Sequence, residues 1–210
     1  MEDLKSNFYQ LVSGYISDAE MRDGLWREIE MAYSQKKRYY HNLNHLNYML
    51  RLAKEHREDL EDWEVVLFSI FYHDIVYNVK RKDNEDKSAK LAAEKLTLLG
   101  LEPKRIDRCK SQIRATKHHE LSEDSDTAYL IDFDLAILGD TWEKYCVYAQ
   151  NIRKEYAIYP DFLYERGRKK VVESFLNSER IFKTDKFFKW REENARANLR
   201  RELEHADSRG

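Results

Sequence analysis

An apolar segment that ends in two polar residues constrains the fold of this chain most strongly. The eight residues Val65–Tyr72 are almost all apolar, and His73 and Asp74 follow them directly. Such a segment is expected to be buried, and burying an ionised Asp is costly unless its charge is paired or binds a metal. Two interpretations follow: Asp74 lies at the solvent end of a core helix, or His73 and Asp74 belong to a metal site.

Composition favours helices in the rest of the chain. Only 6 Gly and 2 Pro interrupt its 210 residues, and 36% of the side chains are charged. Few helix breakers and many strong helix formers predict an all-α fold with solvated outer faces. The length predicts a single domain with enough chain for a sizeable core.

The sequence also argues against several classes of protein. A net charge of −2 provides no broad basic field for nucleic acid, although a local basic patch stays open. Cys109 and Cys146 are far apart and form no CxxC motif, as expected of ordinary thiols in a reducing compartment. The first residues lack a secretory signal, and no apolar run approaches the roughly 20 residues of a membrane span. We therefore expect a cytoplasmic protein that binds neither a membrane nor extended nucleic acid.

Helix caps and breakers divide the chain into segments. Ser17–Glu20 has the pattern of a capping box and predicts a helix to about Tyr33. Either Asn42 or Asn44 is expected to cap a helix that ends near position 56, and the helix with the apolar segment starts near position 62. Further helices are expected at about 85–99, 103–117, 126–138, 141–158, 161–176 and 185–205, with Gly100, Pro103, Gly139, Pro160 and Thr184 near their ends. The last helix is either a solvated face or a surface that pairs with a second copy of the chain.

Two further histidines could complete a metal site with His73 and Asp74. His45 lies on the preceding predicted helix and is the natural third ligand. His41 comes four residues earlier, so it shares a face with His45 if that helix begins early enough. Neutral imidazole and carboxylate together suit a first-row divalent ion such as Mn, Fe, Co, Ni or Zn.

A second apolar segment, Ile131–Leu138, contains two acidic residues, Asp132 and Asp134. Being two positions apart on a helix, these carboxylates point in clearly different directions. We therefore expect only one of them to reach the ion that His73 and Asp74 bind.

These residues belong to an ordered set of separated motifs. The motifs are Arg38–His45, Phe71–Tyr77, Asn84–Ala89, Ile113–His119, Asp132–Gly139 and Ile152–Tyr156. Together they resemble the HD superfamily of metal-dependent phosphohydrolases, and within it a poorly characterised bacterial branch. A His-Asp pair alone is a weak signal, but the ordered set extends over nearly the whole chain.

The resemblance implies a helical bundle of the HD-domain type. Its metal-binding core would span roughly 38–139, and the C-terminal helices in 140–210 would pack on that core. In the superfamily two His and two Asp hold one divalent ion, for which Mg is a candidate besides the first-row metals. Carried over, the ligands are His45, His73, Asp74 and Asp134, because Asp134 rather than Asp132 precedes Leu as in the late motif of the family.

The resemblance also implies a reaction. A divalent ion lowers the pKa of its bound water and stabilises negative charge on a phosphate oxygen. Glu85 is the candidate for positioning water or moving its proton, with Asp86 as the alternative acid, although an acid is also favourable at a helix N-terminus without catalysis. Asp74 and His118 are the other candidate catalytic residues, and His118 is expected to face the phosphate. His118 or His119 would be the extra ligand of a two-metal site, but imidazolium is also favoured at a helix C-terminus.

Further residues are expected to line the substrate pocket or to support the ligands. They are His41, Arg38, Lys117, Asp132 and His119, for which core packing, ion pairing or plain surface exposure are the alternatives. The expected function is hydrolysis of a phosphoester of a small metabolite, such as a nucleotide. Two alternatives stay open: a regulatory protein that binds a nucleotide or phosphate ligand without turnover, and a structural helical protein without metal.

Overall fold

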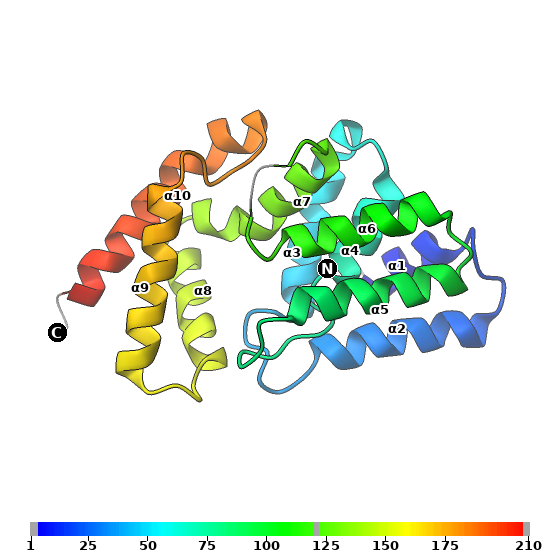
Figure 1. The fold of residues 1–210 in the computed structure, drawn as a ribbon, viewed down its shortest axis with the longest axis horizontal. Coiled ribbons are helices and arrows are strands. Elements are labelled where there is room, and N and C mark those ends of the chain that lie inside the picture. The colour runs from blue at the N-terminus through cyan, green and yellow to red at the C-terminus, as the bar shows by residue number, and fades with distance from the viewer. Residues whose placement is uncertain (1–3, 120–121, 208–210) are drawn as a thin grey trace. The chain divides into compact units, whose positions relative to one another are not determined.

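The structure is a computed structural model that describes residues 4–119 and 122–207. Within these ranges the chain forms ten α-helices, two short 3-10 helices and no strand, which confirms the all-α prediction (Figure 1). No helix of the described ranges is long and apolar enough to cross a membrane. The chain divides into two compact units, Met1–Leu130 and Ile131–Gly210. Packing of the C-terminal helices on a metal-binding core stays a prediction.

The first unit contains six complete α-helices and the beginning of a seventh. They are α1 (Leu4–Val12), α2 (Ala19–Tyr33), α3 (Leu43–Glu55), α4 (Trp63–Tyr72), α5 (Asn84–Leu98), α6 (Pro103–Ala115) and α7 (Ser125–Leu135), with the 3-10 helix η1 (Arg57–Asp59) after α3. The second unit begins within α7 and continues through η2 (Ala136–Gly139), α8 (Trp142–Glu155), α9 (Asp161–Asn177) and α10 (Asp185–Asp207).

The apolar segment forms α4, and α4 is the central helix of the first unit. All eight residues of Val65–Tyr72 are buried, as the sequence predicts. α4 packs against α3, α5 and α6, while α5 and α6 run side by side (Figure 1). The Asp62 side chain caps α4 by accepting a hydrogen bond from the backbone N–H of Val65 at 3.2 Å. A helix that is apolar on every side is stable only with neighbours on every side, and α4 therefore provides a fixed base for His73 and Asp74.

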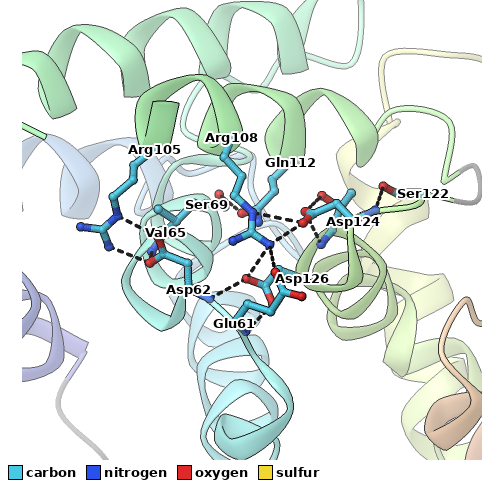
Figure 2. A network of polar contacts seen from close by, with 11 residues as sticks. Glu61, Asp62, Val65, Ser69, Arg105, Arg108, Gln112, Ser122, Asp124 and Asp126 are labelled. Carbon is cyan, nitrogen blue, oxygen red and sulfur yellow. Dashed lines mark hydrogen bonds and ion pairs between the residues drawn. The ribbon is translucent and has the colours of Figure 1, made fainter. Parts of the chain in front are cut away.

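A network of charged side chains holds the start of α4 in place. Its members, called here the charge network, are Glu61, Asp62, Arg105, Arg108, Asp124 and Asp126. Figure 2 shows Arg105 and Arg108 of α6 directed toward these acids. The buried Asp126 carboxylate accepts hydrogen bonds from the backbone N–H groups of Glu61 and Asp62, both at 2.8 Å. The network therefore joins α4, α6 and the first turn of α7.

The structure decides the open choices of helix cap. Asn42, not Asn44, caps α3, since its side chain accepts from the backbone N–H of Asn44 at 2.9 Å. The predicted capping box with Ser17 is wrong: Asp18 is the N-cap of α2 and accepts from the backbone N–H of Glu20. Gly100 follows α5 with φ of 75°, as expected of a glycine that ends a helix.

The predicted helix 126–138 ends early, at Leu135, and continues as the 3-10 helix η2. α10 supplies the reason, because its side chains donate to carbonyls that an α-helix would use. Arg191 donates to the carbonyl of Ala136, and Asn198 donates to the carbonyls of Leu138 and Asp140. α10 can approach this closely only at a glycine, since a Cβ on Gly139 would lie 2.6 Å from the Cβ of Arg191.

Two further boundaries and one whole helix differ from the predictions. α6 ends at Ala115 instead of 117, where the Thr116 hydroxyl donates to the carbonyl of Ile113. α8 ends at Glu155 instead of 158, because the Arg153 guanidinium donates to the carbonyls of Tyr156 and Tyr159. The sequence analysis also missed α1 altogether, although its buried residues Phe8, Leu11 and Val12 have helical spacing.

Candidate metal centre

Three predicted metal ligands lie together in the first unit. His45 comes from α3, while His73 is the C-cap of α4 and Asp74 follows it. The three residues offer ligand atoms that all lie within 4.8 Å of one another, so they could hold a metal ion. We call them the histidine–aspartate cluster. Both imidazoles are buried, and the Asp74 side chain, 14% exposed, is the most accessible of the three.

The distances within the histidine–aspartate cluster fit ligands that share one ion. The Nε2 atoms of His45 and His73 lie 3.3 Å apart, and the Nε2 of His73 lies 3.3 Å from Oδ2 of Asp74. With metal–ligand bonds of about 2.1 Å, neighbouring ligand atoms are separated by about 3.0 Å at a right angle and about 3.4 Å at a tetrahedral angle. Two imidazole nitrogens and a carboxylate are also a donor set that first-row divalent ions accept. The residues present therefore fit a divalent ion.

The tautomer of His73 is set by its own helix. The Nδ1 atom lies 2.8 Å from the carbonyl oxygen of Ile70, which can only accept a hydrogen bond. Nδ1 therefore carries the proton, and in the neutral ring the lone pair of Nε2 points toward His45 and Asp74. A backbone carbonyl that fixes a ligand imidazole in this way is a regular feature of metal sites.

The backbone of Asp74 is held on both of its sides. Its N–H donates to the hydroxyl oxygen of Tyr33 at 3.1 Å, and its carbonyl accepts from Nη1 of Arg38 at 2.7 Å. Arg38 also donates to the carbonyls of His41 and Ile75, at 3.2 and 3.0 Å. The guanidinium thus binds backbone on either side of the cluster, and the predicted role of Arg38 as a residue that supports the ligands agrees with this placement.

His41 lies beside the histidine–aspartate cluster. Its Nε2 is 3.9 Å from Oδ2 of Asp74, and its ring stacks on Tyr77 with centroids 4.4 Å apart. The ring of Tyr77 also has the guanidinium of Arg38 at 5.3 Å from its centroid. Because His41 is part of the loop before α3, it is near the site without sharing a helical face with His45. This placement puts His41 beside the Asp74 carboxylate, and its predicted role at a substrate stays a prediction.

The Asn84–Ala89 motif has a structural task that the sequence analysis missed. The Asn84 side chain accepts from the backbone N–H of Asn78 and donates to its carbonyl, both at 3.1 Å, which closes the loop between them. The Ser88 hydroxyl binds the backbone N–H of Val76 at 3.1 Å. Two side chains of α5 therefore fix the segment that follows Asp74. The Asn and Ser spacing at i and i+4 was the available signal, since it places both on one face of α5.

The candidate acids and cations of the first unit occupy different surroundings. Glu85 is half-buried in the first turn of α5, and within residues 4–119 and 122–207 its carboxylate has no ion-pair partner. Asp86, the alternative acid, pairs with Arg114 at 3.1 Å and lies 3.8 Å from Lys117. Lys117 is therefore engaged by a carboxylate, whereas Glu85 keeps its carboxylate available.

His118 and His119 lie after α6, in the chain that follows its C-cap. His118 is exposed, and His119 has a left-handed backbone conformation with φ of 52°. The group of residues able to hold a metal ion contains neither of them among the described residues. Their predicted roles at the phosphate, or as ligands of a second ion, stay predictions.

The two acids of α7's second half differ sharply in their surroundings. The buried Asp132 accepts hydrogen bonds from the backbone N–H groups of Lys183 and Thr184, at 2.6 and 2.8 Å, and so supports the start of α10. Burial raises the pKa of Asp132 to about 6 despite these two donors. Asp134 is only half-buried. Asp132 thus has a structural role within its own unit, and the ligand role of Asp134 stays a prediction.

No family model, curated protein or solved structure matches this chain. The functional argument therefore depends on the residues themselves. The geometry brings together three of the four predicted ligands, His45, His73 and Asp74, within the first unit.

Proposed function

We propose that the protein is a metal-dependent phosphohydrolase of the HD type that acts on a small phosphorylated metabolite. The observation that carries this proposal is the mutual approach of His45, His73 and Asp74, with 3.3 Å between neighbouring ligand atoms. A divalent ion bound there would supply Lewis acidity toward water and a phosphate oxygen.

The residues of the chain have distinct tasks in this proposal. His45 and His73 hold the ion with neutral nitrogen ligands, and the hydrogen bond from Nδ1 of His73 to Ile70 keeps that ring in the required tautomer. Glu85 accepts the proton of the attacking water, since its carboxylate is half-buried and has no cation paired with it in the described chain. His41 would orient the Asp74 carboxylate or the substrate, since its Nε2 lies 3.9 Å from Oδ2 of Asp74.

Turnover of a phosphoester panel tests this proposal. Purified protein is assayed with nucleotides, sugar phosphates and a chromogenic phosphoester in Mn²⁺, Co²⁺, Ni²⁺ or Mg²⁺. We expect metal-dependent release of phosphate or of a monophosphate product, and a loss of about a thousandfold in Asp74→Ala. The matched control is Asp59→Ala, an acid that pairs with His56 outside the cluster and should leave turnover unchanged.

The same assay separates turnover from binding. If the best ligand binds in a metal-dependent manner and emerges chemically unchanged, the protein is a ligand-binding module and not a hydrolase. If a phosphoester is hydrolysed equally well by wild type and Asp74→Ala, that activity does not come from the histidine–aspartate cluster.

A further inference from the structure

We infer that Arg38 and Tyr33 are positioning residues for the metal centre, and that Arg38 is not a phosphate ligand. The inference rests on the proposed metal centre and adds the groups that preorganise it. Arg38 and Tyr33 hold the backbone of Asp74 from opposite sides of the residue, so they fix where its carboxylate can point. Metal ligands must be held within a fraction of an ångström of their working positions to bind tightly.

The first support is the fixation of Asp74 itself. Asp74 follows the last turn of α4, where helix hydrogen bonds no longer hold the chain. The Tyr33 hydroxyl accepts from its N–H, and Arg38 donates to its carbonyl and to the next carbonyl, that of Ile75. A residue outside regular structure is thus given fixed partners for both of its backbone polar groups.

The second support is the linkage of Asp74 to the chain before α3. The Nη1 atom of Arg38 donates to the carbonyls of both His41 and Asp74. One guanidinium nitrogen therefore sets the separation between the turn after α4 and the segment that leads into α3, from which His45 comes. Moving Arg38 would change the relation of Asp74 to His41 and His45 together.

The third support is the burial of the guanidinium. Arg38 is only 6% exposed, and its guanidinium lies 4.8 Å from the ring centroid of Tyr33 and 5.3 Å from that of Tyr77. Within residues 4–119 and 122–207 no carboxylate pairs with it. The guanidinium donates three hydrogen bonds to backbone carbonyls, and its Nε is buried without a partner among the described residues, so burial keeps it from a phosphate in solution. Burying a guanidinium without a carboxylate partner costs free energy. The inference explains this cost by the fixed position that Arg38 gives to the backbone of Asp74.

Metal affinity tests this inference independently of turnover. Wild type, Arg38→Lys and Tyr33→Phe are titrated with Mn²⁺ or Zn²⁺ by competition with a chromogenic chelator, and the melting temperature of each metal-free protein is measured alongside. Arg38→Lys keeps the charge but cannot reach all three carbonyls, so we expect its metal affinity to fall by about ten- to a hundredfold. Tyr33→Phe keeps the ring beneath Arg38 and loses one hydrogen bond, so its affinity should fall by less.

Arg105→Lys is the matched control. Arg105 is also a partly buried arginine of the first unit with several hydrogen bonds, but its partners are the side chains of Asp62, Glu64 and Tyr15. It should lower the melting temperature without a change in metal affinity. Equal metal affinity in Arg38→Lys and wild type would overturn the inference and leave the metal centre standing. If wild type binds the ion no better than His73→Gln does, the metal centre and this inference both fail.

Discussion

The first unit contains two polar clusters, the charge network and the histidine–aspartate cluster, which differ in the groups that face their carboxylates. In the charge network, guanidinium groups and backbone N–H groups face the carboxylates, so opposite charges compensate one another (Figure 2). In the histidine–aspartate cluster, two imidazole nitrogens and a carboxylate oxygen face one another instead. Lone pairs that converge on one point need a proton or a cation between them. The comparison teaches that buried carboxylates can be compensated entirely by donors of the protein, whereas His45, His73 and Asp74 form a set that could hold a metal ion.

We expect the largest effect on turnover from replacing the two imidazoles whose Nε2 atoms face each other. His45→Gln and His73→Gln should each reduce metal-dependent turnover by about a thousandfold, and the double variant should lose little more, because residues that act as one unit are not additive. Steady-state kinetics on the best substrate measures this. The control is His56→Gln, since His56 pairs with Asp59 and belongs to neither cluster, and this variant should keep activity. Additive losses in the double variant would show that the two rings do not share an ion.

The next largest effect concerns the charge network and should appear in stability alone. Asp126→Ala leaves the backbone N–H groups of Glu61 and Asp62 without their acceptor, so we expect a loss of about 3 kcal/mol in the free energy of unfolding. Glu61→Ala removes an exposed acid from the same Arg108 and should cost no more than about 1 kcal/mol. Urea titrations of the metal-free proteins measure both. A large loss of metal affinity in Asp126→Ala would contradict the separation of the two clusters.

A bound ion should stabilise the wild type by mass action. At about a hundredfold excess of ion over its dissociation constant, the free energy of unfolding should rise by about 2.7 kcal/mol. Thermal unfolding with and without the ion reports this rise, which should be absent in His73→Gln and retained in Asp126→Ala. A similar rise in His73→Gln would place the bound ion elsewhere.

The smallest expected effect is the contribution of the charge network to the pH dependence of the free energy of unfolding. Burial opposes ionisation of Asp62 and Asp124, but hydrogen bonds from Arg105 and Arg108 outweigh it and hold the pKa of both carboxyls below their ordinary 3.8. As pH falls, these carboxyls are therefore protonated at a higher pH in the unfolded chain than in the folded chain. The stabilisation is complete above pH 3.8 and is lost as pH decreases through the lower folded pKa values. Urea titrations from pH 6 to pH 2.5 should show a shallower acid dependence in Asp62→Asn than in wild type.

Much of the architecture follows from the sequence because its signals are local. The apolar segment predicts the burial of α4, and the scarcity of Gly and Pro predicts helices throughout. His45, His73 and Asp74 were predicted as one group, and the structure places them together. Helix ends were less accurate, because Arg153 and Arg191 stop α8 and α7 through side chains whose targets the sequence does not reveal.

The features that could not be predicted from the sequence depend on contacts between segments that are far apart in the chain. Asp132 and Asp134 look alike in sequence, and only the backbone donors of Lys183 and Thr184 distinguish them. The sequence does not reveal which groups Arg38 binds, because its acceptors are backbone carbonyls, which every residue has. In the same way Asn84 and Ser88 bind backbone groups, so their positioning task becomes visible only in three dimensions.

Metal stoichiometry tests the central claim most directly. Wild type, His73→Gln and Asp126→Ala are purified without chelator, dialysed against Mn²⁺, Co²⁺, Ni²⁺ or Zn²⁺, and analysed for metal per chain by mass spectrometry. The account predicts a single tightly held ion in wild type and in Asp126→Ala, and its loss in His73→Gln. Equal metal content in wild type and His73→Gln, or none in wild type, would contradict it.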